Sequence, residues 1–302
     1  MLKLVILIIY FAVLIGIGLY CRKHATDVNG FVLGGRSVGP WLTAFAYGTS
    51  YFSAVVFVGY AGQFGWKYGI AATWAGIGNA IIGSLLAWVV LGRRTRIMSQ
   101  HLDSATMPQY FGKRFGSNPL KIGASVIIFI FLIPYTASLY NGLSRLFGMA
   151  FNIDYSVCII IMATLTAIYV IAGGYMATAI NDFIQGIIML FGIVAVIAAV
   201  IHSKGGFMSA LQGLANVSDP AVSDTPGIFA SFFGPDPFNL LCVVILTSLG
   251  TWGLPQMVQK FYAIDNEASI QKGTVISTIF ALIVSGLSLI HISEPTRRTP
   301  IS

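Results

Sequence analysis

The sequence predicts an all-α protein, a polytopic membrane helix bundle with about eight transmembrane helices. Hydrophobic residues make up 56% of the chain and charged residues only 9%, whereas soluble domains carry roughly 25% charged residues. The uncharged runs are long enough for helices, because crossing a ~30 Å hydrocarbon core at 1.5 Å per residue takes ~20 residues. They also lack the short alternating pattern of barrel strands, so helices are the structure that satisfies their backbone in lipid.

The predicted spans follow one another with mostly short connections. The first begins after Lys3 as a signal peptide would, but it ends in Arg22-Lys23 without a small-residue cleavage site, so we expect it to be retained. Between the third and fourth spans lies a basic segment, Arg93–Lys121, and His202–Asp236 forms an outer loop with a short surface helix. The eight runs are Leu4–Cys21, Ser37–Trp66, Tyr68–Gly92, Ile122–Ser144, Tyr155–Asn181, Phe183–Ile201, Pro237–Gln259 and Gly273–Ser293.

The formal charge of +7 is explained by the positive-inside rule and does not indicate a nucleic-acid partner. This rule places the N-terminus outside and the basic segment in the cytoplasm. The cations assigned to the inside are Arg22, Lys23, Arg36, Arg93, Arg94, Arg96, Lys113, Arg114, Lys121, Lys260 and Lys272, and those assigned to the outside are Lys3, Lys67, Arg145 and Lys204.

Two spans combine glycine and hydroxyl side chains at membrane depth. They are helix 2, through Tyr47–Ser53, and helix 7, through Thr247–Gln256, which also contains a proline. Both are expected to unwind locally, which frees backbone carbonyls and is tolerated where these line a cavity or meet an ion. In a single helix, such residues are explained by packing alone. As a pair five spans apart, they match the broken helices of LeuT-type inverted repeats.

In this interpretation helix 1 is an extra span, helices 2–6 form the first repeat, and helices 7 and 8 open a second. Residues 1–288 are then the N-terminal part of a single transporter domain that continues in a longer protein. The tail, 289–302, resembles peptide translated from sequencing-adapter DNA, and we expect it not to be native.

Several motifs in order resemble the sodium/solute symporter family. They are Phe31–Pro40, Tyr169–Ala177 followed by Asp182 and Gln185, Trp252–Phe261, and Tyr135 with Arg145-Leu146-Phe147. The resemblance covers residues 1–288 and implies sodium-driven import of a small solute by alternating access, in a bacterial inner membrane. Sodium is the implied coupling ion, with no organic cofactor. The partners are the solute and the lipid bilayer, while oligomeric state stays open.

The resemblance also implies a sodium site made by the helix 2 carbonyls of Thr49 and Phe52 and by hydroxyls of a ninth helix outside this chain. Asp182 matches an acidic residue implicated in sodium passage. It interrupts an apolar run, and an intramembrane carboxylate usually marks an ion path. The alternative for Asp182 is a solvated residue at a loop end, because Gly173-Gly174 turns nearby.

Seven residues are expected to line the solute cavity. In the sodium/proline branch the positions of Tyr51 and Thr247 hold Asp and Trp, which argues against proline. For Asn79 an interhelical hydrogen bond is an equal alternative. The predicted lining is Ser50, Tyr51, Ser53, Asn79, Tyr135, Thr251 and Trp252.

Other function classes find little support. The residues include no nucleophile–base pair and no metal-binding spacing, and the three cysteines are scattered, so an enzyme is not expected. A channel would need a ring-forming filter motif. A membrane sensor or scaffold that keeps the fold without transport remains the alternative.

Overall fold

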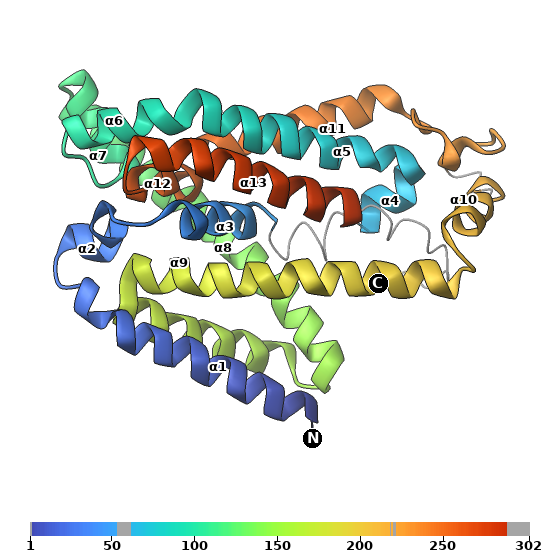
Figure 1. Cartoon of the computed structure of the whole chain (residues 1–302), viewed down its shortest axis with the longest axis horizontal. Coiled ribbons are helices and arrows are strands. Elements are labelled where there is room, and N and C mark those ends of the chain that lie inside the picture. The colour runs from blue at the N-terminus through green and yellow to red at the C-terminus, as the bar shows by residue number, and fades with distance from the viewer. Residues whose placement is uncertain (1, 53–61, 218, 220–221, 289–302) are drawn as a thin grey trace.

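The structure, a computed structural model, describes residues 2–52, 62–217, 219 and 222–288, which form an all-helical bundle (Figure 1). By length and apolar composition, four described segments can each cross a membrane, and the bent pair Pro237–Gly253 and Pro255–Ala263 provides a fifth. The four are Gly62–His101, Asn118–Ser144, Tyr155–Ser203 and Glu267–Ser285. The predicted membrane helix bundle is confirmed, while the count of eight spans stays a prediction.

The helices occur in the order that the apolar runs predict. In chain order they are α1 (Leu2–Cys21), η1 (Arg22–His24), α2 (Val28–Leu33), η2 (Gly34–Arg36), α3 (Pro40–Tyr51), α4 (Gly62–Tyr68), η4 (Gly69–Ala72), α5 (Thr73–Gly78), the π-helical η5 (Asn79–Leu86) and η6 (Trp88–Gly92), α6 (Arg93–His101), α7 (Met107–Phe115), α8 (Asn118–Phe151), α9 (Tyr155–Ser203), α10 (Phe207–Ala215), η7 (Ile228–Ala230), α11 (Pro237–Gly250), η8 (Thr251–Gly253), α12 (Pro255–Ala263) and α13 (Glu267–Ser288). The surface helix expected in the outer loop is α10.

The long helix α9 is two helices joined at Gly174. Its 49 residues would extend ~74 Å as one rod, more than twice the hydrocarbon thickness. Gly174 has φ 57° and ψ −151°, a conformation open to glycine. The two parts run in opposite directions on either side of it (Figure 1). The expected boundary at Asp182 is therefore wrong: the carboxylate stays inside the second part of α9, where it has a basic partner.

The main core surrounds α3. This helix packs against the second part of α9 and against α13. Phe45 contacts Phe183 and Phe280, with ring centroids 4.8 and 5.1 Å apart. In contrast, α8 leaves a row of apolar side chains exposed, including Phe129 (70%) and Phe131 (68%), as expected of a surface that faces lipid or further helices.

Two arginines tie together the loops at the end of the bundle that carries α2, α6 and α7 (Figure 1). The Arg96 guanidinium donates to the carbonyls of Ile264 (2.6 Å) and Asp265 (2.9 Å). Arg36 donates to the carbonyl of Ser104 (2.9 Å). Arg96 is buried and Arg36 is half-buried, and both guanidinium groups bind loop carbonyls. Their positive charge is also what the positive-inside rule expects at a cytoplasmic end.

Candidate functional site

Two helix breaks lie close together in the bundle. In α11–α12, Leu254 is extended (φ −71°, ψ 125°) and the helices on either side are bent by 52°. Pro255 explains the break, because proline has no amide hydrogen and disfavours helical geometry in the residue before it. The predicted break in helix 7 is confirmed.

The other break concerns α3, which ends at Tyr51. Phe52 leaves helical geometry (φ −92°, ψ 66°), and its amide donates to the Gly48 carbonyl at 2.9 Å. Because the final carbonyls of an α-helix have no amide partner within it, those of Thr49, Ser50 and Tyr51, which follow the bonded Gly48 carbonyl, form the open end of α3. Residues 53–61 lie outside the described part of the chain, and the predicted cavity residue Ser53 is among them.

A buried polar cluster connects the two broken helices. The Asn79 Oδ1 atom accepts hydrogen bonds from the Tyr51 hydroxyl (2.9 Å) and the Ser248 hydroxyl (3.0 Å). The Thr247 carbonyl lies 3.2 Å from the same Tyr51 hydroxyl and competes for its single hydrogen. Tyr51, Asn79 and Ser248 are buried, at 7%, 9% and 0% exposure. This Asn79 cluster joins α3, η5 and α11.

The π-helical segment η5 receives further bonds from both broken helices. The Trp252 indole donates to the Ile82 carbonyl (3.0 Å), and the Tyr47 hydroxyl donates to the Gly83 carbonyl (2.9 Å). Helical π segments are often found at functional sites. A Cβ placed on Gly83 would lie 2.0 Å from the Tyr51 hydroxyl oxygen, so the absence of a side chain there lets Tyr51 reach Asn79.

The structure brings together some of the predicted cavity residues. Tyr51, Asn79 and Trp252 belong to or adjoin the Asn79 cluster, and the Thr251 hydroxyl donates to the Ser248 carbonyl at 2.9 Å. Ser248 was missed as an individual residue, although it lies within the polar stretch singled out in helix 7.

The other predicted cavity residues are placed differently. Ser50 is half-buried on α3 beside Tyr51. Tyr135 is half-buried on α8, a helix whose main contacts in the described chain are with α7 and α9. The structure therefore does not join Tyr135 to the Asn79 cluster.

Thr49, one of the two residues with proposed sodium-binding carbonyls, lies where α3 meets α9. The Thr49 hydroxyl donates back to the Phe45 carbonyl (2.9 Å), so the side chain is engaged within its own helix. The Thr49 methyl group faces Gly186, 3.1 Å from where a Cβ on that glycine would lie. The end of α3 thus rests directly on the second part of α9.

Asp182 lies one helical turn from Gly186, ~6 Å along α9 toward Gly174. Its Oδ2 atom is 3.5 Å from the Lys260 Nζ atom of α12. The same ammonium lies 5.3 Å from the centre of the Tyr175 ring, a cation–π arrangement. The Lys260 side chain is 8% exposed and that of Asp182 23%. Lys260 is therefore buried, which corrects its assignment to an inside loop; its burial is offset by the carboxylate and the ring.

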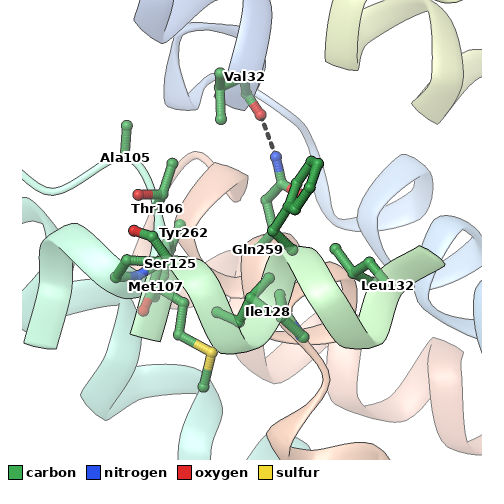
Figure 2. A pocket seen from close by; sticks show the side chains of 12 residues that line it. Val32, Ala105, Thr106, Met107, Ser125, Ile128, Leu132, Gln259 and Tyr262 are labelled. Atoms are coloured by element: carbon green, nitrogen blue, oxygen red, sulfur yellow. Dashed lines mark hydrogen bonds between the residues drawn. The ribbon is translucent and has the colours of Figure 1, made fainter. Parts of the chain in front are cut away.

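A cavity of 440 Å³ lies elsewhere, between α2, α7, α8 and α12 (Figure 2). Its lining is mostly apolar, and Gln259 closes one side by donating to the Val32 carbonyl at 2.6 Å. The predicted sodium and solute residues are absent from its lining. It adjoins α12 one residue before Lys260.

Comparisons with known proteins identify relatives. The chain is 30% identical over 288 residues to the osmoregulated proline transporter OpuE of Bacillus subtilis, covering 92% of this chain and 56% of the relative. It is 32% identical over 282 residues to the sodium/proline symporter of Staphylococcus aureus strain JH9, covering 89% of this chain and 51% of the relative. The chain thus spans about half the length of these relatives.

A solved structure shows the fold. A Na⁺-coupled sialic acid symporter, in its substrate-bound outward-open state, matches with a TM-score of 0.77 at 16% identity, covering 97% of this chain and 61% of that one. The predicted LeuT-type fold is confirmed. The named relatives are transporters rather than enzymes. The family model of the sodium:solute symporter family matches residues 31–294, which is most of this chain, so the chain belongs to that family.

Proposed function

We propose that the complete protein imports a small organic solute together with sodium by alternating access. The observation that carries this proposal is the Asn79 cluster, in which the end of α3 and the bent α11–α12 pair meet at shared polar groups. Family membership supports the coupling to sodium, and the names of the relatives refer to transport of a solute.

For sodium, the proposed ligands are the backbone carbonyls of Thr49 and Phe52. Carbonyl oxygens at an open helix end are suitable ligands for a hard cation, as in other transporters with discontinuous helices. The remaining ligands would be hydroxyls of a helix outside this sequence. Asp182, one turn further along α9 from the Thr49 contact, would then lie on the path by which sodium leaves.

For the solute, the proposed site is built on Tyr51, Asn79, Thr251 and Trp252, with Ser50, Ser53 and Tyr135 as further lining residues. The Asn79 cluster consists of neutral hydroxyl and amide groups, which suit a neutral or zwitterionic polar solute. Sugars and amino acids belong to that class. Tyr51 and Thr247 argue against proline, but it is kept among the solutes to be tested because relatives named for proline share 30–32% identity.

Sodium coupling would supply enough free energy for strong accumulation. One charge crossing 100 mV releases about 2.3 kcal/mol, and a tenfold sodium ratio adds about 1.4 kcal/mol. Together these support roughly 500-fold accumulation of a neutral solute per sodium ion. The N-terminus would lie outside in this topology.

The test is uptake by the full-length gene product in proteoliposomes. Radiolabelled proline, other amino acids, sugars and carboxylates are screened with an inward sodium gradient, and with potassium replacing sodium as the control. We expect one solute class to accumulate only with sodium and to lose accumulation when an ionophore dissipates the gradient. If every solute is indifferent to sodium, the symport proposal is wrong and the sensor or scaffold function gains support.

A further inference from the structure

The ion pair between Lys260 and Asp182 joins two helices that belong to different parts of the bundle. Lys260 lies on α12, just beyond the bend of the second broken helix, and Asp182 lies on the second part of α9. Among the described residues this is the one ion pair or hydrogen bond between α9 and α12. The other described ion pair, Arg93–Glu267, is exposed on the surface (72% and 51%).

The polar contact within this pair is long, and both charged groups keep unused hydrogen-bonding capacity. The nitrogen–oxygen distance of 3.5 Å is longer than the 2.7–2.9 Å of a strong charge-assisted hydrogen bond. In the described part of the chain, Lys260 has no further hydrogen-bond acceptor, although an ammonium has three donors. The Asp182 carboxylate likewise accepts this one contact and keeps unused acceptor capacity. Such a carboxylate can exchange one cation for another.

The ion pair lies about one helical turn from the place where α9 touches Thr49, one of the proposed sodium ligands. Gly186 of α9 touches Thr49 at the open end of α3, and Asp182 lies one turn away on the same face of α9. An ion that leaves the α3 carbonyls along α9 would therefore meet the Asp182 carboxylate while the Lys260 ammonium is bound to it.

We propose that the Lys260 ammonium is an internal competitor of sodium: it occupies Asp182 in the sodium-free state, and an arriving sodium ion displaces it. This inference rests on the proposed sodium symport. The carboxylate neutralises one positive charge, so sodium and the ammonium repel each other when both approach it in a buried place. Displacement breaks the polar contact between α12 and α9, so the arrival of sodium at Asp182 and the opening of this contact become one event.

A reporter position between these helices makes the proposal testable. Ala179 is fully buried and packs in one cluster with Tyr175, Val258 and Tyr262, which come from α9 and α12. The reporter is Ala179→Cys in full-length protein whose native cysteines, which include Cys21, Cys158 and Cys242 of this chain, are all replaced by alanine. Maleimide labelling of the purified protein is measured in sodium and in potassium.

We expect sodium to raise the labelling rate of the reporter by about 5-fold or more, the lower range of measured couplings between sites. In Lys260→Gln the rate should already be high in potassium, and sodium should add little. The same variant should lower the sodium concentration for half-maximal uptake by about 5-fold, because the competing cation is gone. Lys260→Arg, which keeps the charge, is the matched control and should retain the sodium response.

The outcomes separate this inference from the symport proposal. If the parent protein takes up solute with sodium, but Lys260→Gln keeps the same half-maximal sodium concentration and the same sodium-responsive labelling, the competitor role alone is overturned. If the parent shows no sodium dependence, both proposals fall. Should Lys260→Gln not fold, the double variant Asp182→Asn with Lys260→Gln removes both charges. It should label fast in either salt, and a sodium response in it would also overturn the inference.

Discussion

At the scale of single residues, the Asn79 cluster depends on the close approach of the Tyr51 side chain to Asn79. Asn79 can serve Tyr51 and Ser248 together because a carbonyl oxygen has two lone pairs. Tyr51 reaches it across Gly83, where the space for a side chain is already taken by the phenol ring. The cluster therefore needs a glycine as much as it needs its polar groups.

Gly83→Ala should break this arrangement. The new Cβ would lie 2.0 Å from the Tyr51 hydroxyl oxygen, so the ring must move and its bond to Asn79 is lost. We expect a loss of about 1–3 kcal/mol of stability, as for other overpacked sites, and weaker solute binding. Thermal unfolding in detergent and equilibrium solute binding measure both effects.

Gly142→Ala is the matched control for Gly83→Ala. Gly142 also lies in a helix, but nothing is within 4 Å of its missing Cβ, so stability should stay level or rise slightly. A Gly83→Ala protein as stable and as tightly binding as the control would show that Tyr51 has room to move without cost.

At the scale of elements, the arginines at the α6 end join loops that lie far apart in the sequence. Arg96 holds the connection between α12 and α13 through two carbonyls and also donates to Gln100 at 2.7 Å. Val38 pairs with the same connection through backbone bonds to Ala263 (3.2 Å) and Asp265 (3.1 Å). The entrance to α3 is thereby fixed against the exit of α12, which sets the position of both broken helices.

Arg96→Lys should loosen that junction even though the charge is kept. A lysine ammonium does not reproduce the planar fork that reaches three acceptors at once, so at least one buried carbonyl loses its donor. We expect a loss of about 2 kcal/mol, within the cost of unsatisfied buried groups, and an apparent Tm lower by a few degrees. Arg94→Lys, at an exposed position of the same helix, should leave the Tm unchanged. Equal Tm values for the two variants would contradict this account of the junction.

At the scale of the whole molecule, hydropathy and helix-breaking residues predicted much of the fold. Uncharged runs located the spans, because only helices satisfy the backbone in lipid, and the proline of helix 7 located its 52° bend. The boundary between two spans was wrongly placed at Asp182, where the charge interrupts an apolar run, although a turn was expected at Gly173-Gly174, where the structure has it. Lys260, the basic partner of Asp182, lies 78 residues further along the chain, so the local sequence contains no sign of the pair.

The site was predictable only in part, because contacts between helices that are distant in sequence decide which polar residues meet. Polar stretches at membrane depth pointed to Tyr51 and Trp252, since such groups are rare without a function. Which of them meet depends on packing between helices that are distant in sequence. Asn79 makes the interhelical hydrogen bonds that the sequence allowed as an alternative, with Tyr51 and Ser248, and its contact with a solute stays a prediction. Tyr135 was selected by resemblance, and the packing of α8 does not bring it to that cluster.

The orientation in the membrane is the remaining property that charge alone predicts. The basic residues gather around α6 and α7, and the positive-inside rule therefore assigns this end of the bundle to the cytoplasm. The helix α10 lies at the opposite end (Figure 1). Single cysteines in the cysteine-free background test this with a membrane-impermeant maleimide. Ser203→Cys, at the α10 end of α9, should react in intact cells, whereas Arg94→Cys on α6 should react only after permeabilisation. Both positions are exposed, so access to the reagent depends on the side of the membrane. The reverse pattern would place the N-terminus inside and would turn the proposed sodium path through Asp182 toward the outer surface.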